Sequence, residues 1–210
     1  MKKIYLLMLL PLTGQATTLT QGLTVNALIP DNSPVGITST MSVVTTITSI
    51  TSVEVNLDLS GLQTGGWSGD IYAYLIHGSG FSVLLNRTGR SLTSPDGNGN
   101  NSLLLTLNDL AATDVHMAAP LTGALSGTFQ PDGRNVNPSV SLDTTPRLAS
   151  LGVFSTLDGN GDWTLFVSDS AAGGTMTLNS WTLTLNSVPE PSAALLGALG
   201  LTLVLRRRRG

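Results

Sequence analysis

The chain has 210 residues, no cysteine and a formal net charge of −3, from ten basic and 13 acidic side chains. The lack of cysteine excludes disulfides, thiolate metal sites and cysteine nucleophiles. Six basic residues lie at the two ends, so the interior keeps four arginines against eleven aspartates and Glu54, a net charge near −8. This balance argues against a nucleic-acid partner, which needs clustered lysine and arginine, and suits hard cations such as Ca²⁺.

The first 16 residues have the form of a secretory signal peptide. Two lysines precede an apolar run from Ile4 to Leu12, and Gly14 and Ala16 place small residues at the positions that a signal peptidase recognises. The run is shorter than the roughly 20 residues that span a bilayer. We therefore expect residues 1–16 to direct export; a buried N-terminal strand is the alternative.

Residues 17–187 carry short strand patterns separated by turn clusters. Val53 to Leu59 alternates apolar and polar side chains, as a strand with one buried face does. An irregular stretch, 111–151, is broken by four prolines and is expected to hold a short strand near 125–129 and covering loops. The other expected strands are 42–47, 53–59, 71–76, 81–85, 103–107, 163–167 and 180–185. Many short strands at this spacing predict one all-β domain, a jelly-roll-like antiparallel β-sandwich.

One loop of this domain has metal-ligand spacing. Asp158, Asn160 and Asp162 follow the Asp-x-Asn-x-Asp pattern that begins many calcium loops, with glycines between them. Alternate oxygens of such a loop can converge on one hard cation. The glutamate that closes an EF-hand is absent, which excludes that geometry. We expect structural Ca²⁺ here; a metal-free Asx-Gly turn is the alternative. The run from Asp96 to Asn100 is a weaker candidate.

The tryptophans and histidines are the remaining candidates for binding or chemistry. Trp163 and Trp181 each begin a strand and are expected in the core, whereas Trp67 lies in a glycine-rich turn and is expected at the surface. An exposed indole there could stack on a sugar ring. A hydrolase that uses His116 is not excluded by spacing, because triads are recognised by geometry. The nucleophile-elbow motif is incomplete, and we expect no catalytic activity.

Residues 188–210 consist of three parts in order. A Pro-Glu-Pro tripeptide comes first and an apolar run from Ala193 to Leu205 follows. Alanine and leucine favour a helix, and a basic cluster after it favours the cytoplasmic side of a membrane. The run shows no polar face, which argues against the alternative of an amphipathic surface helix. The residues that define the tripeptide and the basic cluster are Pro189, Glu190, Pro191, Arg206, Arg207, Arg208 and Arg209.

This tail resembles the PEP-CTERM sorting signal of Gram-negative bacteria, which has the same three parts in the same order. The resemblance implies transient anchoring in the inner membrane and processing near the tripeptide by an exosortase. It also implies release to the cell surface or the extracellular matrix, often alongside exopolysaccharide production.

Several segments of the interior together resemble the P domain of proprotein convertases, the module that follows the catalytic domain of furin- and kexin-type proteases. The segments are Ile29–Asp31, Gly69–Leu75, Gly161–Asp169 and Asn179–Leu183, in the family order. The chain departs from the family at His77–Gly80, where a Ser-Pro-x-Gly-Thr turn is usual. The resemblance implies a non-catalytic jelly-roll sandwich. It also implies structural calcium, for which Asp31, Asp70 and Asp169 are candidates without assignment to one site.

These observations lead to one expected function and two alternatives. We expect an exported cell-surface or matrix protein that displays a P-domain-like sandwich after sorting through its tail. The first alternative is a carbohydrate-binding module that contacts exopolysaccharide through Trp67. The second is a hydrolase or protease-associated domain.

Overall fold

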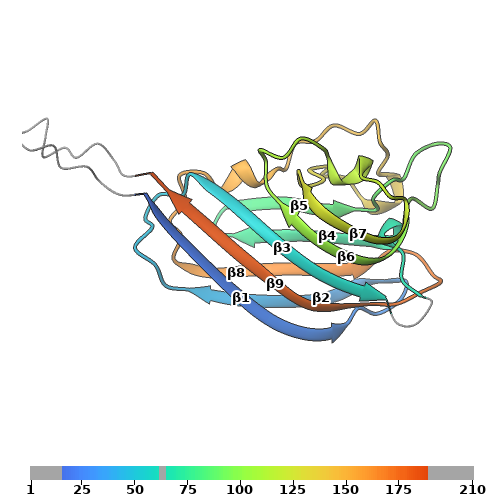
Figure 1. The fold of residues 1–210 in the computed structure, drawn as a ribbon, viewed down its shortest axis with the longest axis horizontal. Coiled ribbons are helices and arrows are strands. Elements are labelled where there is room, and N and C mark those ends of the chain that lie inside the picture. The colour runs from blue at the N-terminus through green and yellow to red at the C-terminus, as the bar shows by residue number, and fades with distance from the viewer. Residues whose placement is uncertain (1–15, 62–64, 189–210) are drawn as a thin grey trace, which may run out of the picture.

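A computed structural model gives the fold of residues 16–61 and 65–188, which form two packed sheets (Figure 1). The predicted signal peptide and the sorting tail lie outside these residues. None of the described helices is long and apolar enough to cross a membrane. The strands are β1 (Thr17–Leu28), β2 (Ser33–Val43), β3 (Ser52–Gly61), β4 (Ile71–His77), β5 (Gly80–Asn86), β6 (Gly99–Leu107), β7 (Thr122–Phe129), β8 (Gly161–Asp169) and β9 (Met176–Ser187). Four short 3-10 helices lie between them: η1 (Ser68–Asp70), η2 (Val115–Met117), η3 (Pro138–Val140) and η4 (Leu151–Phe154).

The two sheets confirm the predicted all-β sandwich. One sheet has the order β1-β9-β3-β6-β7 and the other the order β2-β8-β4-β5. All neighbours pair antiparallel except β6 and β7, which run parallel with Leu103 opposite Leu125. This pair departs from the purely antiparallel prediction. Its physical reason is the connection 108–121, a crossover that contains η2, whereas a short hairpin would have forced the antiparallel arrangement.

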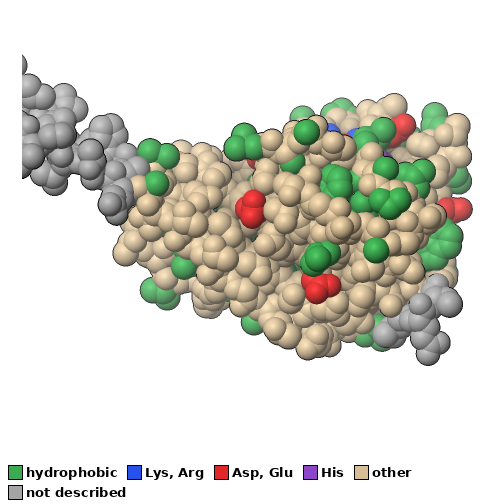
Figure 2. All heavy atoms as spheres, viewed as in Figure 1, with side chains coloured by type: hydrophobic (Ala, Val, Ile, Leu, Met, Phe, Trp, Pro, Cys, Tyr) green, Lys and Arg blue, Asp and Glu red, His purple; other side chains and the backbone are tan. Residues whose placement is uncertain are grey.

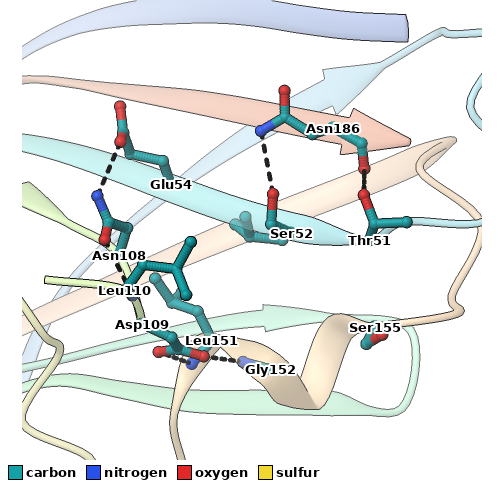
Figure 3. Close-up of a pocket in the computed structure, with 11 residues that line it drawn as sticks. Thr51, Ser52, Glu54, Asn108, Asp109, Leu110, Leu151, Gly152, Ser155 and Asn186 are labelled. Atoms are coloured by element: carbon teal, nitrogen blue, oxygen red, sulfur yellow. Dashed lines mark hydrogen bonds between the residues drawn. The ribbon is translucent and has the colours of Figure 1, made fainter. Parts of the chain in front are cut away.

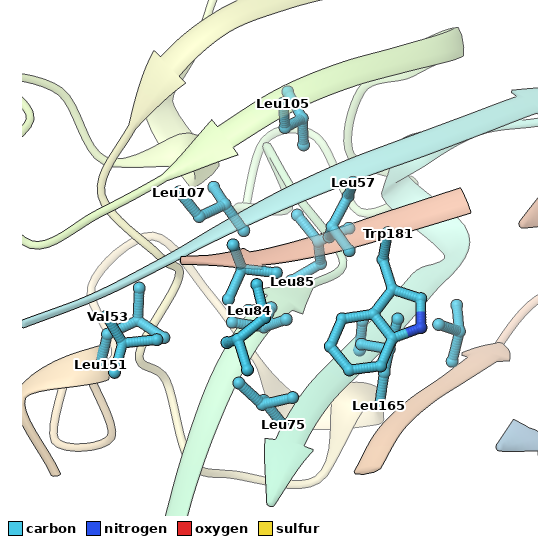
Figure 4. Packing of buried hydrophobic residues seen from close by; sticks show 14 of the residues in the cluster. Val53, Leu57, Leu75, Leu84, Leu85, Leu105, Leu107, Leu151, Leu165 and Trp181 are labelled. Carbon is cyan, nitrogen blue, oxygen red and sulfur yellow. The ribbon is translucent and has the colours of Figure 1, made fainter. Parts of the chain in front are cut away.

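The core lies between the sheets and follows the alternation of the sequence. In β3 the side chains of Val53, Val55, Leu57 and Leu59 face inward and are buried. Leucines of β4, β5, β6 and β8 meet them, with the indole of Trp181 between the layers (Figure 4). The exposed fraction of Trp181 is 1% and that of Trp163 is 0%, which confirms the prediction that both lie in the core. The polar atom of each is satisfied, since Trp181 Nε1 donates to Ser39 Oγ over 2.9 Å and Trp163 Nε1 to the carbonyl of Gly159 over 3.2 Å.

The first two strands were not predicted correctly from the sequence. The strand β1 was missed, although its alternating residues pair with β9 over almost their whole length. The strand predicted at 42–47 is β2, which ends at Val43 and begins nine residues earlier than expected, at Ser33. The start of β2 was missed because Pro34 and Gly36 are residue types that are uncommon within strands. Both are tolerated because β2 is an edge strand with an irregular register between Ser33 and Ile37.

The irregular stretch contains the predicted short strand as β7, and its remainder folds over the edge of the second sheet. The N–H of Asp132 donates to the carbonyl of Leu84, and the N–H of Val83 donates to the carbonyl of Ala149. These bonds cover β5. The opposite outer surface is different, because Figure 2 shows a mostly polar face over β1, β9 and β3, with hydrophobic side chains gathered towards β6 and β7.

Replacement of Trp181 by alanine should test the packing between the sheets. We expect a loss of about 3 to 5 kcal/mol in the free energy of unfolding, because the change removes a buried aromatic ring and leaves Ser39 Oγ without its donor. Urea unfolding followed by circular dichroism measures it. The matched variant Trp67→Ala, at a partly exposed indole, should change the free energy far less. Equal losses in the two variants would contradict this account of the core.

Candidate functional site

Four aspartates come together at the end of the sandwich where β1 ends and β2 begins. Asp31 lies in the β1–β2 turn, Asp70 ends η1 just before β4, and Asp169 is the last residue of β8. The register places Asp169 opposite both Ser33 and Ile71, so three separate chain segments with an aspartate each meet at the same end of the sandwich. Asp96 reaches the same end from the loop before β6 and lines a hollow together with Asp70. We call these residues the aspartate cluster.

The charges of the aspartate cluster are poorly compensated. Asp70 is 7% exposed, and its pKa is raised from 3.8 to about 6, mainly by burial. The charges of Asp169, Asp96 and Asp31 contribute to this rise of the pKa, and the charge of Arg87 opposes it. The Nη2 atom of Arg87 lies 3.5 Å from Asp70 Oδ1, and its Nε donates to the carbonyl of Gly69. Arg87 also acts on Asp169, and Arg90, whose Nε donates to the carbonyl of Pro95, lies near Asp96. Two guanidinium groups therefore face four carboxyl groups. This role of Arg87, which lies 17 positions beyond Asp70, was not predicted from the sequence.

Asp169 has an oxygen without a partner. Its side chain is 0% exposed, and its Oδ1 accepts a hydrogen bond from the N–H of Ala171 over 3.1 Å. The backbone N–H of Asn32 lies near enough to this carboxyl group to lower its pKa. Its Oδ2 is buried with no hydrogen-bond partner among the described residues. Burial is the main reason that the pKa of Asp169 is raised. A buried carboxylate oxygen left in this way is costly, and a bound cation would satisfy it.

The donor set at this place fits calcium better than a transition metal. Carboxylate oxygens are hard ligands, and no cysteine is available anywhere in the chain. Within residues 16–61 and 65–188, no three His, Asp or Glu side chains stand around one point as a finished ligand set. A cation bound to the aspartate cluster would therefore complete its shell with backbone carbonyls and water, which Ca²⁺ accepts readily with its six to eight ligands.

A hollow of about 300 Å³ opens beside the aspartate cluster. The indole of Trp67 is 44% exposed, which agrees with its predicted surface position. We call this space the Trp67 hollow. Its lining residues are Trp67, Asp70, Asp96, Ala171, Ala172 and Gly173.

The chain around Trp67 is held rigidly by its neighbours. The carbonyl of Trp67 accepts from the N–H of Asp70 over 3.0 Å, which fixes the indole and the carboxyl group on one short turn. Gly69 allows the 96–98 segment to pack directly against this turn, since a Cβ at position 69 would stand 2.1 Å from the carbonyl oxygen of Asp96. The N–H of Gly69 then donates to the carbonyl of Asn98 over 2.8 Å. These contacts hold the walls of the Trp67 hollow in place, so the hollow is preformed.

The predicted calcium loop lies at the opposite end of the sandwich, before β8. Asp158 Oδ1 accepts from the N–H and from Nδ2 of Asn160, and these bonds lower the pKa of Asp158. Asn160 Oδ1 accepts from the N–H of Thr45 over 2.8 Å, and Ser42 Oγ donates to Asp162 Oδ1. The three side chains are close in sequence, but their oxygens are engaged with different groups.

The ring of His77 contacts two backbone carbonyl groups of this loop. Its Nδ1 lies 3.0 Å from the carbonyl oxygen of Asp162 and its Nε2 lies 2.6 Å from that of Asp158. The ring also stacks on Trp163, with the two centroids 4.0 Å apart. The charge of His77 lowers the pKa of Asp158. The oxygens of this loop thus have protein partners, and calcium at this loop stays a prediction.

A second hollow, of about 350 Å³, lies near the chain ends where β3 begins and β9 ends (Figure 3). Its carboxyl groups are committed to the fold. Both oxygens of Asp109 accept from the first N–H groups of η4, those of Leu151 and Gly152. Glu54 Oε2 accepts from Asn108 Nδ2 over 3.1 Å. None of its lining carboxyl groups has a buried oxygen without a partner, in contrast to Asp169 of the aspartate cluster, and we assign this hollow a structural role.

His116 is buried in a cluster of charged side chains, at the border of a hollow of about 190 Å³. Its Nδ1 lies 2.9 Å from Asp132 Oδ2 and its Nε2 lies 3.0 Å from the carbonyl oxygen of Arg90. Arg134 bridges Asp132 and Asp114. With both ring nitrogens engaged in this way, the ring serves to tie the irregular stretch to the loop after β5.

Comparison with known proteins gives few relatives. No protein family and no curated protein matches the chain in sequence. Two crystal structures of a serine protease of Aeromonas sobria are similar in shape. The protease in complex with its chaperone has a TM-score of 0.47 and 15% identity, covering 85% of this chain and 28% of the protease chain. The protease alone has a TM-score of 0.45 and 17% identity, covering 83% and 27%. The chain thus spans just over a quarter of the length of the protease. The proteolytic activity and the chaperone belong to the Aeromonas protein and are not assigned to this chain.

Titration of Asp70 should be visible in the stability of the metal-free protein. Its raised pKa means that the folded state binds this proton more tightly than the unfolded chain does. The resulting stability is complete below about pH 4 and is lost as the pH rises through about 6. Thermal melting in EDTA across this range measures the loss. Asp70→Asn should flatten the profile, whereas the control Asp58→Asn on β3 should keep it; a profile unchanged by Asp70→Asn would refute the assignment.

Proposed function

We propose that the protein is an exported, non-catalytic β-sandwich module whose aspartate cluster holds a structural calcium ion. The single observation that carries the proposal is the buried, unpartnered Oδ2 of Asp169 beside the strongly perturbed Asp70. A folded domain tolerates such a pair poorly unless a proton or a cation neutralises it. Ca²⁺ is the cation whose ligand preferences the site meets.

Asp70 and Asp169 would hold the ion, with backbone carbonyls and water completing its shell and Asp31 in the neighbouring turn, and its contribution would be mechanical. The three residues belong to the β1–β2 turn, to η1 and to the end of β8. A common ligand would tie these segments together at the point where the two sheets are joined only by loops. It would also lower the raised pKa of Asp70, because a positive charge favours the ionised carboxylate.

Calcium should therefore raise the melting temperature of the protein. Binding to the folded state alone, at a free concentration about 100 times the dissociation constant, adds about 2.7 kcal/mol. For a domain of this size the shift is roughly 5 to 10 °C. The measurement is thermal melting in millimolar calcium and in excess EDTA, at neutral pH.

Two double variants separate the two candidate loops. Asp70→Asn with Asp169→Asn should abolish most of the shift, because both side chains keep their shape but lose their charge. Asp158→Asn with Asp162→Asn should leave it intact under this proposal. If the second pair removes the shift instead, calcium binds the loop predicted from sequence. If the wild type melts at the same temperature in both buffers, neither site holds calcium.

The place of action that we propose is the cell surface or the extracellular matrix. It is supported by the signal-like N-terminus and by the order of Pro189–Pro191, the apolar run and Arg206–Arg209. An exosortase-type enzyme would process the tail after transient anchoring in the inner membrane. The P-domain-like motifs support display of the sandwich as a non-catalytic module. The alternatives of an exopolysaccharide-binding module and of a hydrolase or protease-associated domain remain predictions.

The tail should be absent from the mature protein. Intact-mass analysis of protein released from the cell surface should show loss of residues after about position 191, because the tripeptide marks the processing region. Replacing Arg206–Arg209 by glutamine should leave the protein unprocessed and retained in the cell. Recovery of the arginine cluster on released wild-type protein would show that the tail is not a processing signal.

A further inference from the structure

Strand β1 forms an outer edge of the five-stranded sheet, because among the described strands it pairs with β9 only (Figure 1). Over residues 17–24 this pairing runs without interruption, and the register shifts only beyond Thr24. We call residues 17–24 the β1 edge. It contains no charged residue and no proline. Natural proteins protect a sheet edge with a lysine, a proline, a bulge or a covering loop, and the β1 edge has none of these within it.

The other three edges of the two sheets are covered or interrupted. Loop residues 132–149 cover β5 through the backbone hydrogen bonds described above. In β7, Gly123 and Gly127 have positive φ angles, which break the extended outline of the strand. In β2, Pro34 lacks an N–H group and the register is irregular before Ile37. The β1 edge therefore differs from the other edges in offering a regular, open ladder.

The hydrogen bonds of β9 identify the backbone groups that the β1 edge leaves free. The carbonyl of Asn186 accepts from the N–H of Thr51 over 2.8 Å, so the backbone groups of Asn186 point towards β3. Thr18 lies opposite Asn186, and its own N–H and C=O therefore point away from β9. By alternation along the strand, the same orientation holds for Thr20, Gly22 and Thr24. Within residues 16–61 and 65–188, these four residues make no backbone hydrogen bond outside the sheet ladders.

The side chains of β1 leave apolar surface uncovered. Leu19 and Leu23 pack against the core but are only half-buried. Their cross-strand neighbours on β9, Leu185 and Trp181, are fully buried. The difference arises because β9 has a strand on each side and β1 has only one. A strand added beside β1 would remove this apolar surface from water as well as pair the free backbone groups.

We propose that the β1 edge pairs antiparallel with the β1 edge of a second copy of the chain, which joins two five-stranded sheets across a two-fold axis. The partner strand must be extended, uncharged and open along one side, and a second copy presents such a strand by symmetry. The domain is acidic, so two copies repel one another over much of their surface. The strands β1, β2 and β9 contain no charged residue, and this side lets the copies approach.

A two-fold axis at Gln21 gives the register that uses every free group. It places Thr18 opposite Thr24 of the second copy and Thr20 opposite Gly22, so the outward N–H and C=O groups of all four residues are paired. On the inner face, Leu19 comes to lie opposite Leu23 of the second copy. This inference is independent of the proposed calcium site.

The test of the contact is the mass of the purified full chain in solution, measured by sedimentation equilibrium over a range of concentrations. We expect a reversible dimer. Thr20→Pro removes an N–H that points to the free side, and Thr20→Lys places a charge on the edge. Each should raise the dissociation constant of the dimer about tenfold or more, because the change occurs twice at the axis. Thr128→Lys, at an exposed position of the edge strand β7, is the matched control and should dimerise as the wild type does.

Disulfide formation tests the register. The chain has no cysteine, so Gln21→Cys introduces a single thiol. At the axis this thiol faces its counterpart across a non-hydrogen-bonded pair, whose Cα atoms stand about 4.5 Å apart, within the range of a disulfide. Mild oxidation should give covalent dimers of Gln21→Cys and none of the control Thr128→Cys.

The outcomes decide between this contact and others. A chain that stays monomeric up to its solubility limit overturns the proposal. A dimer that both Thr20 variants leave unchanged, with circular dichroism showing that they fold, overturns the β1 edge as the contact. Equal cross-linking of the two cysteine variants overturns the register. A dimer weakened by both Thr20 variants and not by Thr128→Lys, with cross-linking confined to Gln21→Cys, supports the proposal.

Discussion

Burial of two tryptophans between two sheets is the constraint on which the rest of this structure depends. Trp181 belongs to the five-stranded sheet and Trp163 to the four-stranded sheet, and both are fully enclosed. Because side chains alternate along a strand, placing these rings inside also fixes the face of every neighbouring residue. A shift of one residue would expose an indole and bury a threonine or an aspartate. The register that avoids this also determines which strand ends, and therefore which loops, lie side by side.

The two ends of the sandwich treat their acidic loops in opposite ways. At one end, the loop from Asp158 to Asp162 closes on itself through Asn160, and both ring nitrogens of His77 lie within hydrogen-bond distance of its carbonyl oxygens. At the other end, the carboxyl groups of Asp70 and Asp169 face Arg87, and among the described residues Asp169 Oδ2 has no hydrogen-bond partner. The calcium site that we propose lies at this second end.

The irregular stretch after β6 shows how a domain without disulfides stabilises long loops. Arg134 contacts Asp114 at 2.9 Å and Asp132 at 3.2 Å, and His116 contacts Asp132 at 2.9 Å. All of these groups are largely enclosed, and Asp132 and Arg134 also bond to backbone groups around them. Each buried charge therefore has partners, as the cost of desolvation requires. The loops in turn cover β5, which would otherwise be an open sheet edge.

The sequence by itself determined the class of fold, most strands and the interior position of Trp163 and Trp181. Alternation along segments such as Val53 to Leu59 is a local property, and it survives folding because one face of each strand must be buried. Edge strands carry a weaker signal, which is why β1 was missed and β2 was misplaced around Pro34. The sequence also marked Asp31, Asp70 and Asp169 one by one, without showing that they meet. Only the tertiary structure decided that they share one end of the sandwich with Asp96 and Trp67, because cross-strand register joins positions more than 130 residues apart. The same register places His77 next to the backbone carbonyl of Asp158 and leaves Asp169 Oδ2 without a hydrogen-bond partner among the described residues. No local pattern in the sequence distinguishes the surroundings of these two aspartates.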